Sequence, residues 1–158
     1  MTHPSLESPP GLLHLCDLRV RVSTPIEAGQ DARGRHRIIP ITGGTVTGAR
    51  VSGKVLDLGA DWQCVGPDLA AVLDTRYAIE TEDGALIDVR NFGHRHGPRP
   101  VMEALMRGEV PDPALIYFRT NPRFETRDPR YDWLNRTIFI GTGLREPDCV
   151  VLRFWEVA

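Results

Sequence analysis

Short segments with the side-chain alternation of β-strands follow one another along most of the chain. Residues 12–22 end with three apolar side chains on one face and two arginines on the other. Residues 45–56 alternate more loosely, and Gly48 and Gly53 interrupt them. A glycine inside a strand often marks a bulge or a sharp bend. Because such bends allow a sheet to close on itself, the pattern favours a curved sheet.

Helical patterns are scarce. Residues 100–107 have a proline in their first turn and Gly108 just past their end, and a second short turn is expected at residues 129–134. About eight to ten short strands with glycine-rich connections predict an all-β fold, either a sandwich or a barrel. We favour a closed antiparallel β-barrel with one or two short helices, because a single sheet of that size must curl or split.

The composition fits one globular domain. Of the 158 residues, 41 % are hydrophobic and 25 % are charged. Residues 1–10 are polar and contain three prolines, which predicts a disordered tail before a single barrel domain at residues 11–158. Three widely spaced cysteines, no signal-peptide pattern and no stretch near the ~20 apolar residues of a membrane span lead us to expect a cytoplasmic protein without membrane contact.

The basic residues are almost all arginines. There are 19 basic and 21 acidic residues, giving a net charge of −2, and Lys54 is the only lysine. With this balance the protein lacks the excess of positive charge that binds nucleic-acid phosphates, so nucleic acid is not expected as a partner. Arg76 and Arg119 are the two arginines that we expect inside the barrel, where a planar guanidinium can hold a carboxylate or an oxyanion.

Residues 70–93 contain the clearest hairpin signal. Two runs rich in β-forming residues flank Asp83-Gly84, and Asp-Gly is a favoured two-residue turn. With these two residues as the loop, Arg76 pairs with Asn91. The face toward a partly polar lumen then carries Asp74, Arg76, Ala78, Val89 and Asn91. A register slip of one residue would exchange the faces.

Seven short strings stand in one order along the chain. They are GADWQ (59–63), DTRY (74–77), DG (83–84), NFG (91–93), YFRT (117–120), FET (124–126) and WLN (133–135). On this ordered set the chain resembles the DUF3237 family, also called UPF0311, from about residue 12 to the C-terminus. The resemblance implies a compact antiparallel β-barrel similar to the allene oxide cyclase and dirigent barrels, which guide cyclisation or coupling of apolar substrates. It supplies no catalytic set to carry over residue by residue.

Charged, amide and aromatic side chains lie in or beside these strings. Tyr117 and Arg119 are two residues apart on a strand and therefore share a face. A tyrosine hydroxyl, a guanidinium and an amide together polarise a carbonyl or hold an enolate. A carboxyl group moves a proton when a low-dielectric pocket raises its pKa. We predict catalytic roles for Asp61, Glu125, Tyr117 and Arg119, and substrate binding by Arg76, Asn91, Trp62, Trp133 and Asn135.

Each of these residues also has a structural interpretation. Arginine–carboxylate pairs inside a barrel can simply neutralise each other. Trp62 and Trp133 can fill core volume instead of lining a pocket or its rim.

His94 and His96 have the spacing of a metal-binding pair on a strand. Gly93 and Gly97 flank them, which favours a loop, and no third ligand is evident. We therefore expect neither a metal nor a cofactor. The two histidines remain candidates for a substrate-facing acid or base. Cys64 is expected to be a buried structural thiol.

The function predicted from these features is a cofactor-independent isomerase, cyclase or lyase. Its ligand would be a small carbonyl or phenolic compound in the barrel lumen. One alternative is a non-catalytic carrier or sensor barrel of the lipocalin kind that uses the same lumen. Another is a structural protein with a filled core whose outer face forms a homo-oligomer. An interior without any cavity larger than a single water would favour the last of these.

Overall fold

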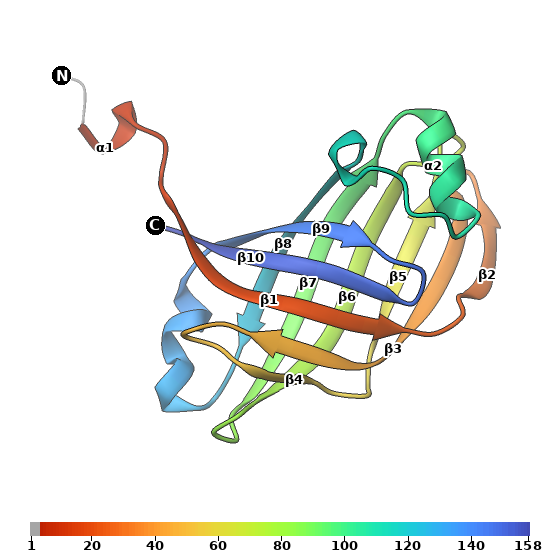
Figure 1. The fold of residues 1–158 in the computed structure, drawn as a ribbon. Helices are drawn as coiled ribbons and strands as arrows, with labels where there is room; N and C mark the ends of the chain where they lie inside the picture. Colours follow the sequence, from red (N-terminus) through yellow and green to blue (C-terminus); the bar gives the residue numbers. More distant parts are fainter. Residues whose placement is uncertain (1–3) are drawn as a thin grey trace.

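The chain folds into an antiparallel β-barrel that is covered at its two ends by short helical segments (Figure 1). The computed structural model describes residues 4–158. In this part of the chain the elements are α1 (Pro4–Glu7), β1 (Leu12–Val22), β2 (Ile26–Asp31), β3 (Gly34–Thr47), β4 (Gly53–Val55), β5 (Ala60–Val65), β6 (Ala71–Thr81), β7 (Leu86–His96), α2 (Arg99–Met106), η1 (Pro113–Leu115), β8 (Tyr117–Glu125), η2 (Pro129–Arg136), β9 (Phe139–Arg145) and β10 (Cys149–Val157).

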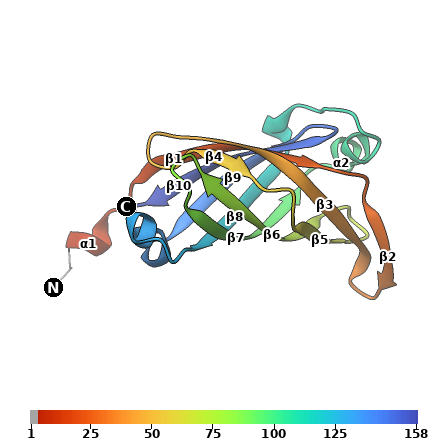
Figure 2. The same ribbon diagram turned by 90° about the horizontal axis from the view of Figure 1, so that it is seen from below.

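The sheet closes because β1 pairs with a strand on each of its sides. Along one edge β1 lies antiparallel to β10, and its residues 17–22 pair along the other edge with residues 41–47 of β3. From β10 the ladder continues through β9, β8 and β7 to β6. β4 and β5 share one position between β6 and β3, and β2 follows β1 along the same edge of β3. The ten strands of the described chain thus fill eight positions, and the predicted closed barrel is confirmed (Figures 1 and 2).

The hairpin between β6 and β7 turns through three residues instead of the predicted two. The amide of Gly84 donates to the carbonyl of Thr81 at 3.0 Å, and Gly84 has a φ of +89°. This is a type I turn followed by a left-handed residue, a common three-residue loop. The extra loop residue shifts the register by one, so that Arg76 lies opposite Arg90 and not opposite Asn91. The predicted register is wrong for this reason.

The register shift exchanges the two faces of β6. Its inward side chains include Leu73, Tyr77 and Ile79, which are all buried. The prediction that Asp74, Arg76 and Ala78 face the lumen is wrong, because a slip of one residue turns a strand over. Val89 and Asn91 of β7 are buried and face inward, as predicted.

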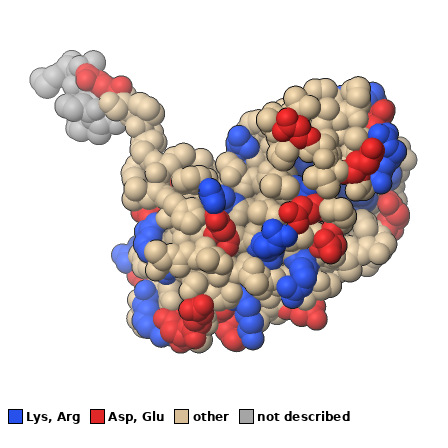
Figure 3. All heavy atoms as spheres, in the orientation of Figure 1, with Lys and Arg blue, Asp and Glu red and all other residues tan. Residues whose placement is uncertain are grey.

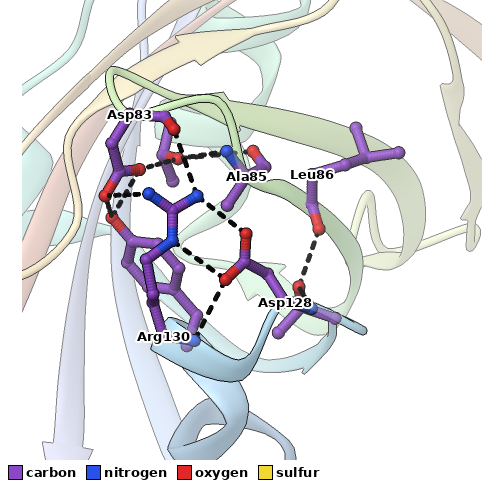
Figure 4. Close-up of polar contacts among 8 residues, drawn as sticks. Asp83, Ala85, Leu86, Asp128 and Arg130 are labelled. Carbon is purple, nitrogen blue, oxygen red and sulfur yellow. Dashed lines mark hydrogen bonds and ion pairs between the residues drawn. The ribbon is translucent and has the colours of Figure 1, made fainter.

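Side chains of η2 hold this hairpin against the barrel (Figure 4). Arg130 donates from Nη2 to the carbonyl of Asp83 at 3.1 Å, and its Nη1 lies 3.2 Å from the Asp83 carboxylate. The Tyr131 hydroxyl donates to the same carboxylate at 2.9 Å. The Asp128 carboxylate accepts from Nε and Nη2 of Arg130 at 3.0 and 2.8 Å, which orients the guanidinium. These contacts fix η2 across one end of the barrel.

Apolar side chains fill the interior at the η2 end. Leu134 of η2 is buried against this core. The rings of Phe124 and Phe139 meet edge to face with centroids 4.9 Å apart. The core continues into β1 and β7 with Leu15, Cys16, Leu18, Ile87 and Val89. Polar interior side chains are therefore left for the opposite end, which α2 covers.

The predicted helical segments are confirmed. Residues 100–107 correspond to α2, whose Met102 and Leu105 are buried, and residues 129–134 lie in η2. Within residues 4–158, neither these helices nor α1 is long and apolar enough to cross a membrane.

The N-terminal segment leads away from the barrel (Figures 1 and 2). We predicted a disordered tail at residues 1–10, and residues 1–3 of that tail lie outside the described residues. Residues 4–7 form the single turn of α1.

The three-residue loop predicts that Gly84→Ala destabilises the protein by about 1–2 kcal/mol, since an added Cβ meets no atom within 4 Å but occupies a left-handed position. Gly11→Ala is a matched control, because Gly11 also has open space around it but no left-handed φ, and it should change stability by less than about 0.5 kcal/mol. Urea unfolding measures both values. Equal effects at the two positions would contradict the loop conformation.

Candidate functional site

A small cavity lies inside the barrel at the end that α2 covers. Its free volume is about 40 Å³, which is room for only a few water molecules but more than a single-water void. The cavity is bordered mainly by apolar side chains from β1, β3 and β10 and by polar side chains from β5, β6, β7, β8 and β9. The polar lining consists of Asp61, Gln63, Thr75, Tyr77, Asn91, Arg95, Thr120 of β8 and Arg145.

Asp61 of β5 is held by two hydrogen bonds in the wall of this cavity. The Thr75 hydroxyl donates to Oδ1 at 2.9 Å, and Gln63 Nε2 donates to Oδ2 at 2.7 Å. Thr75 lies opposite Asp61 in the β5–β6 ladder, and Gln63 is two residues along the same face of β5. Arg37 Nη2 in turn donates to Gln63 Oε1 at 2.8 Å, so a chain of hydrogen bonds leads from a guanidinium to the carboxyl group.

Burial raises the pKa of Asp61 above its ordinary value. The hydrogen bonds from Gln63 and Thr75 and the charge of Arg95 act in the opposite direction, but loss of solvation outweighs them. The pKa of this carboxyl group is thereby moved toward the range in which a carboxyl group exchanges protons near neutrality.

Three arginines enter the same end of the interior from three strands: Arg37 from β3, Arg95 from β7 and Arg145 from β9. Arg95 is only 3 % exposed, and its guanidinium carbon lies 5.7 Å from the centroid of the Phe118 ring. The Nε atoms of Arg37 and Arg95 are buried without a hydrogen-bond partner. Burial, together with the charges of Arg145 and Arg37, lowers the pKa of Arg95 to about 10. A positive charge is therefore concentrated here and poorly solvated.

Arginines elsewhere on the molecule are mostly paired with carboxylates, and Figure 3 shows acidic and basic side chains side by side on one face. In the described part of the chain, twelve arginines form such pairs, namely Arg19, Arg33, Arg35, Arg50, Arg76, Arg90, Arg99, Arg107, Arg127, Arg130, Arg136 and Arg153. Within residues 4–158 no carboxylate forms such a pair with Arg37, Arg95 or Arg145. The three inner arginines face the single carboxyl group of Asp61.

Tyr77 and Asn91 add neutral polar atoms that lack partners. Tyr77 is 1 % exposed, and its hydroxyl has no hydrogen-bond partner in the described structure, like Oδ1 of Asn91. Burial raises the pKa of Tyr77, so the phenol keeps its proton. A buried polar group without a partner costs about 1–3 kcal/mol, and a ligand that supplies the missing partners would remove that cost.

The inner arginines also border a hollow on the outside of the barrel. This α2 groove, with a free volume of about 180 Å³, is lined by Arg37, Arg95, Arg145, Leu105, Met106, Glu109 and Glu146, with Pro25, Gly108 and Pro147 at its margins. Arg95 and Arg145 line both the α2 groove and the inner cavity. Their side chains therefore separate the cavity from the surface.

Of the residues predicted to form the site, Asp61 and Asn91 border the inner cavity. Arg76 does not, because the hairpin register turns it outward. Its side chain is 66 % exposed and pairs with Asp88 at 2.9 Å. The prediction that Arg76 lies inside the barrel is therefore wrong.

Tyr117 and Arg119 share a face of β8 as predicted, but it is the outer face. The inward positions of this strand belong to Phe118 and Thr120, which are buried. Arg119 instead donates to the Phe118 carbonyl at 2.9 Å, and its guanidinium lies 5.4 Å from the centroid of the Tyr117 ring. Glu125 is exposed on the same outer face. The predicted placement of Arg119 inside the barrel is wrong.

The other predicted binding residues lie away from the cavity. Trp62 is 51 % exposed on the outer face of β5. Trp133 is half-buried at the η2 end, where the Arg50 guanidinium lies 4.9 Å from its ring centroid. Asn135 accepts from the Thr126 amide at 2.8 Å and donates to its carbonyl at 2.9 Å, which attaches η2 to the end of β8.

His94 and His96 lie on β7, so the predicted loop is wrong. Both point outward, and His96 stacks on Tyr117 with ring centroids 4.8 Å apart. Cys64 is partly exposed, not buried, and its Sγ is 3.8 Å from Nε2 of His36. In the described part of the chain no group of three metal-ligating His, Cys, Asp or Glu side chains comes together.

A larger hollow, about 890 Å³, is an open groove on the outside between β8 and η2. It brings together Arg76, Glu125 and Asn135 of the predicted set. Its arginines include Arg76 and Arg136, which already pair with carboxylates at 2.9 and 2.6 Å. The groove therefore lacks the buried unpaired groups of the inner cavity, which is the better candidate for a functional site.

Sequence reasoning missed Arg95, Gln63, Tyr77 and Arg145. A signal for Arg95 is present, because the alternation of β7 continues past Asn91 and places position 95 on the same inward face. Because we interpreted residues 93–97 as a loop, we did not assign Arg95 to the inward face.

The sequence also matches a known family. A family model described as a protein of unknown function, DUF3237, matches residues 10–157. The chain belongs to the DUF3237 family. This DUF3237 chain is 44 % identical over 154 residues to a UPF0311 protein of Rhodopseudomonas palustris, with 98 % of each chain covered. It is 47 % identical over 140 residues to a UPF0311 protein of Bradyrhizobium diazoefficiens, covering 89 % of this chain and 91 % of the relative. The resemblance based on the seven strings is confirmed.

Solved structures of DUF3237 relatives share the barrel. A protein of unknown function from Rhodopseudomonas palustris has 43 % identity and a TM-score of 0.90, covering 94 % of this chain and 99 % of that one. A beta-barrel-like protein from Acinetobacter baumannii has 38 % identity and a TM-score of 0.86 over the full length of both. A structure described as an enzyme from Penicillium herquei has 22 % identity and a TM-score of 0.73, covering 100 % and 99 %, and is alike in fold alone.

Two aspartates with opposite pKa shifts predict opposite pH dependences of stability. Because the folded pKa of Asp61 lies above the unfolded value of 3.8, the wild type should lose stability relative to Asp61→Asn as the pH rises from 3.8 through the folded pKa. Hydrogen bonds from Arg153 lower the pKa of Asp17 to about 2, so the advantage of the wild type over Asp17→Asn should shrink as the pH falls below 3.8. Urea unfolding between pH 3 and pH 7 measures both differences. A stability difference between wild type and Asp61→Asn that is independent of pH would contradict the shift.

Proposed function

We propose that this DUF3237 barrel is a cofactor-independent isomerase, cyclase or lyase that acts on a small carbonyl or phenolic compound. The reacting end of the compound enters the inner cavity. The observation that carries the proposal is the Asp61 carboxyl group, with its raised pKa, in the wall of a cavity where Arg95 Nε, the Tyr77 hydroxyl and Asn91 Oδ1 are buried without partners. A titratable group shifted by burial beside specific charges is typical of acid–base sites.

In this proposal Asp61 moves the proton. In its ionised form it removes a proton from the carbon next to a carbonyl. The electron pair of the broken C–H bond forms a carbon–carbon double bond, and the π pair of the carbonyl moves onto its oxygen. The Tyr77 hydroxyl donates to the resulting enolate oxygen, and the nearby positive charge of Arg95 stabilises it. The enolate then re-forms the carbonyl. In an isomerase Asp61 returns the proton to the far carbon of a conjugated enolate, so the double bond shifts, and in a lyase it protonates the group that leaves as its bond to the β-carbon breaks. Poor solvation of the cavity strengthens the attraction between the oxyanion and Arg95.

The proposal reassigns part of the predicted site. Tyr117, Arg119 and Glu125 lie outside the barrel, so the acid–base role passes to Asp61 alone. The role of holding the oxyanion passes from Arg119 to Arg95. Asn91 keeps its predicted binding role, because it borders the cavity with a free carbonyl oxygen and an amide that can donate.

A carrier or sensor that uses the same cavity is the second candidate. The inner arginines, of which Arg37 and Arg95 have a buried Nε without a partner, support binding as well as they support catalysis. A carrier, however, needs no group poised to exchange protons, so loss of turnover without loss of binding at Asp61 separates the two functions.

The test is exchange of carbon-bound hydrogen with solvent. Small ketones, enones and phenols are incubated with the protein in D₂O, and deuterium incorporation is followed by NMR. We expect the wild type to accelerate exchange for at least one compound and Asp61→Asn to slow it by about 100-fold or more. Asp74→Asn is the matched control, since Asp74 lies on the outer face of β6 with Arg90 Nη2 3.4 Å away, and its exchange rate should equal that of the wild type. Equal rates for Asp61→Asn and wild type would overturn the proposal.

A further inference from the structure

We infer that the substrate is a small oxo carboxylate, whose carboxylate lies between Arg95 and Arg145 and whose oxo end extends toward Asp61 and Asn91. The inference rests on the proposed function, because it names the class of substrate for the same cavity. It is carried by the charge balance, the free donors and the shape of the cavity and the α2 groove.

The charge balance requires an anion. Arg37, Arg95 and Arg145 face one carboxyl group, and burial favours the protonated, neutral form of that group. The two carboxylates of the α2 groove do not compensate the excess. Glu109 pairs with Arg107 at 2.7 Å and Glu146 pairs with Arg19 at 2.7 Å. Buried charges are stable in proteins when they are paired, so the missing partner is expected to come from a ligand.

The free donors match a carboxylate. A guanidinium presents its N–H groups in a planar fork that binds both oxygens of a carboxylate at once. The same contact occurs on the surface of this protein, where Nε and Nη2 of Arg153 donate to the two carboxylate oxygens of Asp17 at 2.7 and 2.8 Å. Arg95 has no such partner among the described residues, and its Nε is buried without an acceptor.

The shape limits the size of the substrate. Arg95 and Arg145 stand between the inner cavity of about 40 Å³ and the α2 groove of about 180 Å³. A carboxylate held by both guanidiniums therefore leaves a cavity of a few water volumes on its inner side, which is enough for a short oxo group. The α2 groove supplies the entrance, and its apolar lining by Leu105 and Met106 accepts a small substituent on the same molecule.

Pyruvate is the probe for this inference, and methyl pyruvate is the matched compound without the negative charge. Binding is measured by titration calorimetry and by the ligand-dependent rise in Tm. We expect pyruvate to bind the wild type at least tenfold more tightly than methyl pyruvate does. Equal affinities would overturn the inference. If inorganic phosphate binds as tightly as pyruvate, and Arg95→Met and Arg145→Gln both lose that binding, the ligand is an inorganic anion and not an oxo carboxylate.

Three arginine variants separate the inner site from the surface. Arg95→Met replaces a buried, unpaired charge with an apolar side chain of similar length, so it should fold with a Tm at or above that of the wild type and show no shift with pyruvate. Arg145 is less buried than Arg95, so Arg145→Gln is expected to fold. It should weaken pyruvate binding at least tenfold, and it therefore tests the inference even if Arg95→Met does not fold. Arg153→Gln, a surface arginine paired with Asp17, should bind pyruvate like the wild type. Wild-type binding by both Arg95→Met and Arg145→Gln would contradict the inference.

Failure of this inference can be told from failure of the proposed function by Asp61→Asn. We expect this variant to bind pyruvate as tightly as the wild type while losing deuterium exchange at the pyruvate methyl group. Exchange that is unchanged in Asp61→Asn, with binding lost in Arg95→Met, would overturn the proposed function and leave the anion site standing. Asp61-dependent exchange of neutral ketones, without binding of pyruvate, would overturn the anion site and leave the function standing.

Discussion

The pairing of β1 with β3 determines what the inside of this protein contains. Since β1 is already paired with β10, this second ladder closes the sheet, and every second side chain of the barrel strands then faces an enclosed interior. At the η2 end the enclosed side chains are aliphatic and aromatic and form the core. At the α2 end the same alternation carries Asp61, Asn91 and Arg95 inside, and there the interior is not completely filled.

The arginines divide by position into two groups with different energetics. Surface arginines such as Arg76 pair with carboxylates in water, where solvent screening leaves each pair with little effect on stability. Arg95 is buried beside Arg37 and Arg145, and such an arrangement lowers stability unless an anion joins it. The three buried arginines therefore lower the stability of the folded protein, and the same arginines allow it to bind an anion. This trade is typical of functional sites.

The sequence predicted the architecture better than the site. Alternation, the number of strands and the glycines within them were enough for the closed barrel, because these patterns average over many residues. The proline and glycine that flank residues 100–107 were enough for α2. Which side chains face the lumen depends on the register between β6 and β7, and a shift of one residue changes them all. One extra residue in the loop at Gly84 turned Arg76 outward, and the flanking glycines concealed that β7 continues to Arg95. Arg37 and Arg145 come from distant strands, so only closure of the barrel places them beside Asp61.

Membership of the DUF3237 family adds the fold to this picture but no reaction, so the chemistry has to be found in the cavity itself. The most direct measurement is a crystal structure of the protein with pyruvate bound. We predict a carboxylate within about 3 Å of the guanidinium nitrogens of both Arg95 and Arg145, with the oxo group on the Asp61 side. Pyruvate found only in the outer groove between β8 and η2, with the inner arginines untouched, would contradict the assignment of the inner cavity as the functional site.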